Sequence, residues 1–277
     1  MTTLGLFQRE VTVAVLASGS AGNCTYIGDR HAGVLVDCGL STRRILRRME
    51  ELDLQDAPID AVLITHEHSD HIGAARVLAN QLRKKTGRSI PFYMTRGTHA
   101  GAAPQCIPDG LEYIQAGQSF RVRHIEVDPF TIPHDVQDPV AFRVQVGDTS
   151  TAVITDLGRP TALVARKMRQ CDVLVLEYNH DTRQLMEGAY PWHLKQRIRS
   201  NHGHLSNDQA DQLLTQGLGH KLRHLVLAHL SEQNNNRDRA AAHATQTLHK
   251  LGADHVSVQV ARQDAPLPPL RVTASAW

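Results

Sequence analysis

Short apolar runs alternate along the chain with segments that have the periodicity of amphipathic helices. An apolar run of roughly four to eight residues, bounded by glycine or polar residues, is typical of a buried strand. Runs of this kind predict strands at Val11–Ala17, Cys24–Gly28, Gly33–Val36, Ala61–Ile64, Pro91–Thr95, Phe120–Val127, Val140–Val146, Thr151–Thr155, Asp172–Leu176 and Leu225–Ala228.

Helical periodicity and capping residues place helices between these strands. The predicted helices cover Ser41–Leu52, His71–Lys85, Pro160–Arg169 and Arg237–Leu251, with two more that begin near Pro191 and Ser206. Strand-rich halves with interspersed helices predict an α/β fold in which helices cover two packed sheets, as a single αββα domain over residues 1–262. After Gln263 the sequence Ala-Pro-Leu-Pro-Pro favours an extended proline-rich tail, residues 263–277, outside the core.

Composition restricts the class of protein without identifying it. With 277 residues, 41% hydrophobic and 21% charged, the chain resembles ordinary globular proteins. The net charge of +2 permits an anionic substrate but does not require one. The four cysteines form no C-x-x-C pair, and we expect them to be buried and reduced. Arg9 and Glu10 interrupt any signal-peptide pattern and no apolar run is long enough for a membrane span, so we expect a cytoplasmic protein without a membrane partner.

The densest group of metal-ligand side chains directly follows a predicted buried strand. The segment Thr65–His71 has the sequence THEHSDH, which places three imidazoles and a carboxylate within six residues. His66 and His68 can converge on one divalent ion, while Asp70 and His71 point towards a second. Imidazole and carboxylate ligands suit zinc, manganese or iron(II) better than magnesium or calcium. The alternative, a histidine-rich surface loop without a metal, rarely concentrates so many ligands behind a core strand.

A site with two ions needs more ligands than this segment provides. Three further candidates each stand at the end of an apolar run, and they are His134, Asp156 and His229. A carboxylate at Asp156 can bridge two ions that share a hydroxide. Each candidate taken alone could equally be a loop histidine, a helix cap or a buried core residue.

These residues resemble the motifs of the metallo-β-lactamase superfamily. Residues 66–71 match its H-x-H-x-D-H motif, and Leu35–Gly39 resembles its earlier aspartate motif. The resemblance implies that Asp37 orients a ligand histidine and that two metals lie in a cleft at the sheet edges. The later motifs of the superfamily map onto the three candidates His134, Asp156 and His229.

Further motifs resemble one subgroup, the YycJ (WalJ) proteins. The resemblance runs from about residue 11 to 260 and implies a nucleic-acid phosphodiesterase, specifically a 5′→3′ exonuclease on double-stranded DNA. The superfamily fold alone implies no particular substrate. The segments that carry the resemblance are Leu16–Cys24, Pro133–Asp135, Asp138–Pro139, Leu176–Asp181, Gly203–Asn207 and Ala228–Asn235.

Glu177 and His204 distinguish between classes of hydrolase. The segment Gly203–Ser206 resembles the helix-start histidine segment of ribonuclease Z, in which a histidine paired with a glutamate protonates the leaving alkoxide. A phosphodiester needs such an acid because its sugar oxygen is a poor leaving group. We therefore expect catalytic roles for Asp70, Glu177 and His204. The role of His180 is open between a more distant structural role, a phosphate contact and an additional metal ligand.

Two groups of residues are candidates for binding substrate phosphates. The glycine-rich segment Ser18–Asn23, with Ser18 and Asn23 at its ends, can form a phosphate nest or a simple tight turn. The basic residues Lys195, Arg197 and Arg199 can bind flanking phosphates or form a solvated helix face.

The function that the sequence favours is hydrolysis of a nucleic acid, preferably DNA, by two divalent ions (zinc, manganese or iron) with a metal-bridging hydroxide as nucleophile. One alternative is a small-molecule hydrolase acting on a lactone, a thioester or a cyclic phosphodiester. The other is a non-enzymatic regulatory protein that retains the fold. The sequence does not indicate an oligomeric state.

Overall fold

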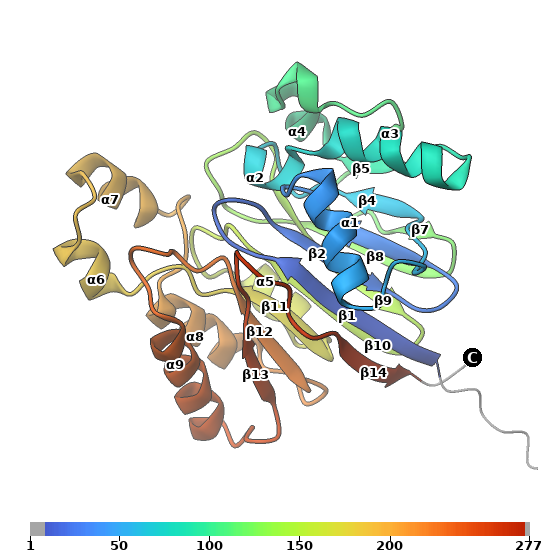
Figure 1. Cartoon of the computed structure of the whole chain (residues 1–277). Coiled ribbons are helices and arrows are strands. Elements are labelled where there is room, and N and C mark those ends of the chain that lie inside the picture. The colour runs from blue at the N-terminus through green and yellow to red at the C-terminus, as the bar shows by residue number, and fades with distance from the viewer. Residues whose placement is uncertain (1–8, 275–277) are drawn as a thin grey trace, which may run out of the picture.

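Two seven-stranded β-sheets pack face to face in the computed structural model, which describes residues 9–274 (Figure 1). The first sheet has the order β14-β1-β2-β3-β4-β5-β6. Its strands are β1 (Arg9–Ala17), β2 (Cys24–Gly28), β3 (Gly33–Val36), β4 (Ala61–Leu63), β5 (Phe92–Met94), β6 (Leu111–Tyr113) and β14 (Leu270–Ala274). The second sheet has the order β13-β12-β11-β10-β9-β8-β7. Its strands are β7 (Phe120–Val122), β8 (Ile125–Thr131), β9 (Val140–Val146), β10 (Thr149–Ile154), β11 (Val173–Glu177), β12 (His224–Ala228) and β13 (Ser257–Val260).

Helices cover the outer faces of both sheets, which confirms the predicted αββα arrangement. The first sheet is covered by α1 (Thr42–Glu51) and α3 (Ala75–Thr86). The second is covered by α5 (Ala162–Met168), α8 (Asn207–Gly217) and α9 (Arg237–Lys250). The shorter elements are α2 (Ser69–Ile72), α4 (Arg96–Gly101), a 3₁₀ turn (Pro104–Cys106), α6 (Thr182–Glu187) and α7 (Trp192–Ile198). Helices α6 and α7 project from one end of the sandwich, on the left in Figure 1.

The core forms three apolar layers because both faces of each sheet are buried. In β1, Val13 belongs to the layer between the sheets, whereas the next residue, Ala14, packs under the helices of the first sheet. Phe142 and Val175 reach the central layer from the second sheet. Strands buried on both faces appear in the sequence as continuous apolar runs, which is why the strands could be predicted from short runs of this kind.

The direction of the strands brings polar residues from distant parts of the sequence to one edge. Strands β3 to β6 run parallel in the first sheet, and β10 to β13 run parallel in the second. The residues that follow parallel strands meet at the same edge of a sheet, which is where open α/β sheets bind ligands. Several candidate site residues lie at or just beyond these strand ends: Asp37, His66, Asp156, Glu177 and His229.

The predicted helix over residues 71–85 is interrupted in the structure by a change of hydrogen-bond partners. The carbonyl of Asp70 accepts from the N–H of Asn23 at 2.7 Å, and the N–H of Ala74 donates to Cys38 at 3.0 Å. The hydrogen bond that would continue the helix is therefore replaced, and α2 ends before α3 begins. The predicted strand over residues 120–127 was also wrong in detail, since it is a hairpin of β7 and β8 that turns at Arg123 (φ 57°).

The expectation of a tail from residue 263 onwards was wrong for residues 270–274. These residues form β14, which pairs antiparallel with β1 in a register that places Leu270 opposite Val13 and Val272 opposite Val11. Both Leu270 and Val272 are buried in the layer between the sheets. The prolines at 266, 268 and 269 precede the strand, so they do not remove hydrogen bonds from it. Residues 275–277 lie outside the described part.

Candidate metal centre and active-site cleft

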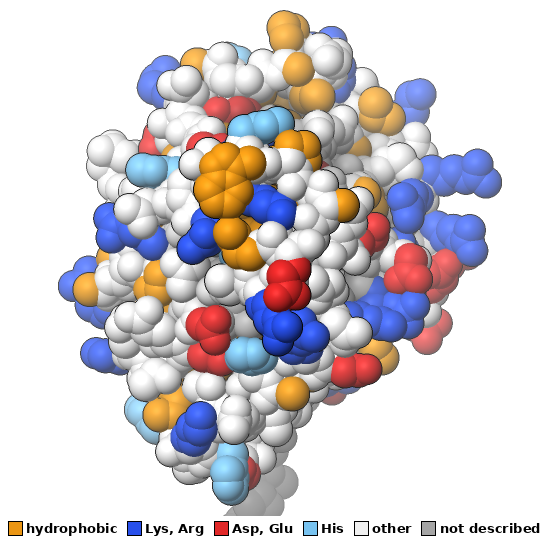
Figure 2. Space-filling view, turned by 90° about the vertical axis from the view of Figure 1, so that its left-hand side faces the viewer, with side chains coloured by type: hydrophobic (Ala, Val, Ile, Leu, Met, Phe, Trp, Pro, Cys, Tyr) orange, Lys and Arg blue, Asp and Glu red, His pale blue; other side chains and the backbone are white. Residues whose placement is uncertain are grey.

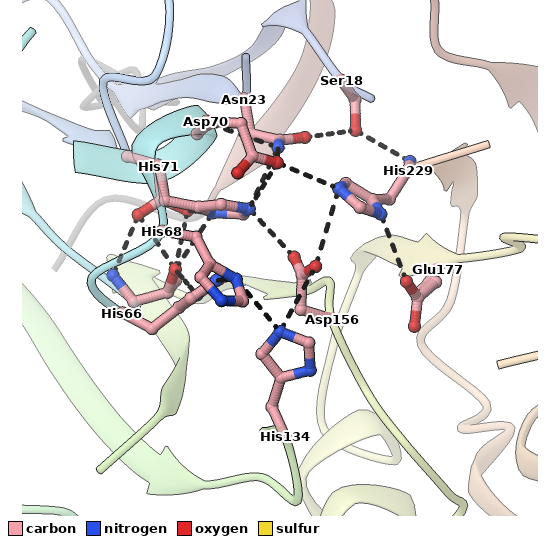
Figure 3. Close-up of polar contacts among 12 residues, drawn as sticks. Ser18, Asn23, His66, His68, Asp70, His71, His134, Asp156, Glu177 and His229 are labelled. Carbon is pink, nitrogen blue, oxygen red and sulfur yellow. Dashed lines mark hydrogen bonds and ion pairs between the residues drawn. The ribbon is translucent and has the colours of Figure 1, made fainter. Parts of the chain in front are cut away.

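The structure brings the side chains of all the candidate metal ligands into one cluster (Figure 3). Groups whose ligand atoms lie within 4.8 Å of one another combine His66, His68 and His134 on one side and Asp70, His71 and His229 on the other. Asp156 lies between the two sides. These residues come from both sheets, so the cluster spans the edge of the sandwich.

Three ring nitrogens converge on the first side of the cluster. Nε2 of His66 lies 3.0 Å from Nδ1 of His68, which lies 3.4 Å from Nε2 of His134. One proton can satisfy only one such pair, whereas a cation can satisfy all three nitrogens. In a tetrahedral zinc site with bonds of about 2.0–2.1 Å, neighbouring ligand atoms are about 3.3 Å apart. The spacing therefore fits a small transition-metal ion.

The second side is richer in carboxylates. Oδ2 of Asp70 lies 3.5 Å from Nε2 of both His71 and His229. Oδ1 of Asp156 lies 3.6 Å from Nε2 of His229 and 3.8 Å from Nε2 of His134, while its Oδ2 lies 3.0 Å from Nε2 of His71. This Oδ2 is buried and makes no hydrogen bond of acceptable geometry to any described residue. A buried carboxylate oxygen in that state is costly unless a cation neutralises it, so the donor set fits a divalent metal.

The second nitrogen of four histidines is held by a neighbouring group. Nδ1 of His66 contacts Thr65 at 3.0 Å, Nδ1 of His71 contacts Asp37 at 2.8 Å, Nδ1 of His134 donates to the carbonyl of Gly203 at 3.2 Å, and Nδ1 of His229 lies 3.3 Å from Glu177. Such contacts fix the ring orientation and leave Nε2 free to bind a metal. Asp37 therefore has the position that the sequence motif implies, against a histidine of the cluster.

Charge differs between the two sides of the cluster. Burial and the neighbouring His71 lower the pKa of His66 well below its ordinary value, which keeps this imidazole neutral. Burial also disfavours the charged form of His229, but Asp156, Asp70 and Glu177 outweigh burial and raise its pKa to about 10. Without a metal, protons therefore neutralise the carboxylate side. A divalent ion would take their place, so metal binding would release protons.

Two residues of the cluster and Asp37 behind it have left-handed backbone conformations. The φ angles are 61° at Asp37, 57° at Asp156 and 53° at His229. Each such conformation costs on the order of 1 kcal/mol or more in a residue other than glycine, and such residues concentrate at functional sites. The sheet edge holds these three side chains at sharp turns directed into the cluster.

Glu177 and His204 form a pair beside the metal-ligand cluster. Oε1 of Glu177 lies 2.8 Å from Nδ1 of His204, and Oε2 accepts the backbone N–H groups of Leu157 and Leu205 at 2.8 and 3.1 Å. Burial raises the pKa of Glu177, but the charge of His204 outweighs it and lowers that pKa to about 2. Burial also opposes the charged form of His204, yet Glu177 and Asp156 raise its pKa above the ordinary value. The side chain of His204 is 22% exposed, so it can reach a bound substrate.

His180 is buried next to this pair without joining the cluster. Its side chain belongs to none of the groups of potential ligands, and its Nδ1 has no hydrogen-bond partner among the described residues. Burial lowers the pKa of His180 to about 4, so the ring is neutral. Of the roles that the sequence left open, the geometry does not support that of a metal ligand.

Ser18 and Asn23 were candidates for a phosphate nest, but the structure uses their side chains within the protein. Both are buried, and Oγ of Ser18 donates to Oδ1 of Asn23 at 3.0 Å. Ser18 also accepts the N–H of His229 at 2.8 Å, and Nδ2 of Asn23 donates to the carbonyl of Gly19 and lies 3.1 Å from His71. These two residues position members of the metal cluster and are not available to a substrate.

The three basic candidates have different environments. Nζ of Lys195 donates to the carbonyls of Met186 and Gly188 at 2.7 Å, so it holds α7 against α6. Arg199 is exposed but does not line the cleft, and its Nη1 lies 3.2 Å from the sulfur of Met186. Arg197 does line the cleft, where it pairs with Asp135 at 2.6 Å. Of the three, the structure places only Arg197 at the site.

A cleft with a volume of about 230 Å³ opens over the cluster. One wall consists of polar residues from the cluster, and the opposite wall comes from α7 and the segment before it. The sequence analysis missed the residues of that second wall, which are Tyr190, Leu194 and Ile198, and also Asn179, whose side chain donates to the carbonyl of His229 at 2.8 Å. The apolar residues 194 and 198, four positions apart, could have indicated an apolar helix face. Nothing in the sequence shows that this face is directed toward the cleft.

Comparison with known proteins agrees with this geometry. A family model described as the beta-lactamase superfamily domain matches residues 33–230, most of the chain and all the residues of the cluster. The fold and the histidine–carboxylate cluster define a metal-dependent hydrolase. The chain belongs to the beta-lactamase superfamily.

Within this superfamily the chain is similar to named relatives over most of its length. It is 33% identical over 248 residues to exodeoxyribonuclease WalJ of Streptococcus pneumoniae, covering 87% of this chain and 88% of that protein. It is 32% identical over 242 residues to exodeoxyribonuclease YycJ of Bacillus anthracis, covering 86% and 89%. These values confirm the resemblance to the YycJ and WalJ proteins.

Solved structures support the fold. The metallo-β-lactamase fold protein YhfI of Bacillus subtilis superposes with a TM-score of 0.67 at 16% identity, over 94% of this chain and 99% of that chain. Human tRNase Z, short form, gives a TM-score of 0.60 at 16% identity, over 92% and 98%. No helix within residues 9–274 is both long and apolar enough to cross a bilayer.

Proposed function

We propose that this protein is a metal-dependent exonuclease that hydrolyses the phosphodiester bonds of DNA. The observation that carries the proposal is the 2.8 Å contact between Glu177 and His204 beside the metal-ligand cluster, at the wall of the cleft. A histidine held in this way is suited to protonate a poor leaving group. The similarity to exodeoxyribonucleases over 86–87% of the chain supports the same substrate class.

The cluster has enough donors for two divalent ions, and we propose zinc, manganese or iron(II) as the metals. His66, His68 and His134 would hold one ion, Asp70, His71 and His229 would hold the other, and Asp156 would contact both. Bound there, two divalent ions would polarise the phosphodiester and lower the pKa of the attacking water.

Each remaining residue has a separate task in the hydrolysis. A water molecule releases a proton to solvent as its oxygen forms the new bond to phosphorus, and the bond from phosphorus to the departing sugar oxygen breaks. The proton of His204 passes to that oxygen, while Glu177 holds the imidazole through Nδ1 so that Nε2 faces the cleft. Asp37, Ser18 and Asn23 keep the histidines of the cluster oriented and do not contact the substrate.

Double-stranded DNA degraded from the 5′ end is the proposed substrate, in line with the subgroup that the sequence motifs resemble. A panel of substrates tests this proposal directly. Purified protein loaded with zinc, manganese or iron(II) is incubated with double-stranded DNA, single-stranded DNA and RNA, each labelled at the 5′ or the 3′ end, and with bis-p-nitrophenyl phosphate and a lactone.

We expect early release of the 5′ label from double-stranded DNA and weaker activity on the other polymers. Rapid lactone hydrolysis with intact DNA would instead establish a small-molecule hydrolase. Inactivity on every substrate, at full metal occupancy, would favour the non-enzymatic alternative.

A further inference from the structure

The apolar side chains of α7 are not explained by packing of the core. None of the seven residues of α7 is fully buried. Leu194 and Ile198 are half-buried, stand four residues apart on one helix face, and line the cleft together with Tyr190 and with Arg197, whose charge is paired with Asp135. The opposite face of the helix, which includes Gln196, is exposed to solvent. Hydrophobic, basic and histidine side chains gather on the face of the molecule toward which α6 and α7 project (Figure 2).

This apolar wall is attached firmly to the catalytic groups. The N–H of His204 donates to the carbonyl of Ile198 at 2.9 Å, and the carbonyl of Gly203 accepts from His134 at 3.2 Å. A Cβ at Gly203 would lie 2.2 Å from the Ile198 carbonyl oxygen and 2.3 Å from that of Arg197, so the backbones are in direct contact there. The wall therefore has a fixed distance from the proposed acid and from the metal cluster.

The dimensions of the cleft restrict what can lie between its walls. Pockets that enclose a drug-sized molecule typically have about 300–1,000 Å³. A cleft of about 230 Å³ is smaller than such pockets, so it can take a phosphodiester with part of one nucleotide but not a double helix. In the proposed hydrolysis His68, Asp70 and His204 would face the phosphodiester, and the side chains of α7 would face the group attached to it. In a nucleic acid that group is a sugar with its base.

We infer that Tyr190, Leu194 and Ile198 form a subsite for the base of the departing nucleotide, which must leave the duplex before its phosphodiester is cut. The inference rests on the proposed nuclease function. We place the subsite on the side of the departing nucleotide because the wall is joined to His204, the residue proposed to protonate the departing oxygen. Enzymes that do chemistry on a base within a duplex extrude that base from the stack, at a cost in free energy, and the subsite would hold a base extruded in the same way.

An apolar wall of this kind contacts the face of a base rather than its hydrogen-bonding edge. All four bases have a similar aromatic face, so such contacts are tolerant of sequence. The subsite thus suits an exonuclease that removes every nucleotide in turn. It also predicts that the rate of nucleotide release depends on whether the terminal bases are paired, and not on which bases they are.

The experiment compares two duplexes whose terminal 5′ nucleotide is unpaired in both; it carries a mismatched base in one and is abasic in the other. Rates of release are measured for the metal-loaded wild-type protein, for Tyr190→Ala with Leu194→Ala, and for the control Gln196→Ala on the exposed face of the same helix. Elemental analysis of each variant reports whether the cluster still holds its metal.

We expect the wild-type protein and Gln196→Ala to release the abasic nucleotide roughly 10-fold more slowly than the mismatched one, in line with base stacking on aromatic side chains. The double variant should lose this difference, because the base then has no apolar side chains to contact. Equal release of both nucleotides by the wild-type protein overturns the subsite alone, even if no variant folds. Release of neither nucleotide overturns both the nuclease function and the subsite.

Discussion

Oε1 of Glu177 lies 2.8 Å from Nδ1 of His204, and Glu177 is completely buried. The same oxygen lies 3.3 Å from Nδ1 of His229, on the carboxylate side of the metal cluster. A single carboxylate therefore orients the proposed acid and a proposed metal ligand at the same time. This arrangement links the position of the proposed acid to the position of the cluster. A change at Glu177 would therefore disturb both His204 and His229, whereas a change at His204 affects the proposed acid alone.

Replacing the proposed acid should separate DNA cleavage from metal binding. We expect His204→Ala to retain its metal and to cut DNA about 10²–10⁴-fold more slowly, because the sugar oxygen then departs without a proton. Hydrolysis of bis-p-nitrophenyl phosphate should fall much less, since nitrophenolate leaves without protonation. His202→Ala, an exposed histidine in the same loop, is the matched control. Equal losses on both substrates would make His204 a positioning residue instead.

Removing the metal should abolish hydrolysis and lower the melting temperature. Ligand binding at 100 times Kd stabilises a folded protein by about 2.7 kcal/mol, which corresponds to roughly 5–10 °C for a chain of this size. Asp156→Ala should reduce the metal content below the expected two ions and should lose most of this thermal shift. Elemental analysis and calorimetry, with and without a chelator, measure both quantities. Full occupancy and full activity in Asp156→Ala would contradict the two-ion assignment.

Asp37 offers a test of ligand orientation without direct contact to the proposed metal. Its carboxylate contacts Nδ1 of His71 at 2.8 Å and accepts the N–H of Thr65 at 2.9 Å. We expect Asp37→Asn to weaken metal affinity about 10–100-fold, as is typical for groups behind a ligand histidine. Asparagine tolerates the left-handed φ of 61°, so the backbone should be retained.

The control for this substitution is Asp53→Asn, at an exposed residue with a φ of 57°. Metal titration monitored by calorimetry gives the two affinities. An unchanged affinity in Asp37→Asn would show that Thr65 alone is sufficient to orient His71.

The C-terminal strand should contribute to stability as a core element. Leu270 is buried between the sheets, so Leu270→Ala should lower the free energy of unfolding by about 2–5 kcal/mol. Thr273 is exposed on the same strand, and Thr273→Ala should change it by no more than about 0.5 kcal/mol. Urea denaturation measures both values. A tail that lies outside the core would give equally small changes for the two variants.

The sequence predicted which side chains gather at the sheet edge, because local patterns determine most of this arrangement. Ligands at the ends of apolar runs meet when the strands are parallel, and the runs at 61–64, 151–155 and 225–228 were all recognisable. For the helix predicted over residues 71–85, the deciding interaction was distant in sequence. The carbonyl of Asp70 is bonded to Asn23, 47 residues earlier, and this contact interrupts the expected helix.

The substrate side of the cleft was harder to predict, since it depends on the direction of side chains in short helices. Lys195 and Arg197 are two residues apart, yet one holds α6 and the other faces the cleft. Charge alone does not distinguish them. Similarly, the proline-rich segment hid a strand, because local composition cannot show that β1 has a free edge for β14.

The hydrogen bond from the backbone of His229 to Ser18 joins residues that are 211 positions apart. During synthesis a ribosome adds about 5–20 residues per second, so Ser18 and the histidines of residues 66–71 emerge many seconds before His229. A nascent chain that has reached α3 contains four of the proposed ligands and lacks the other three. The complete set of proposed donors exists only once β12 has joined the second sheet. The proposed metal would therefore be bound with full affinity only after both sheets have assembled.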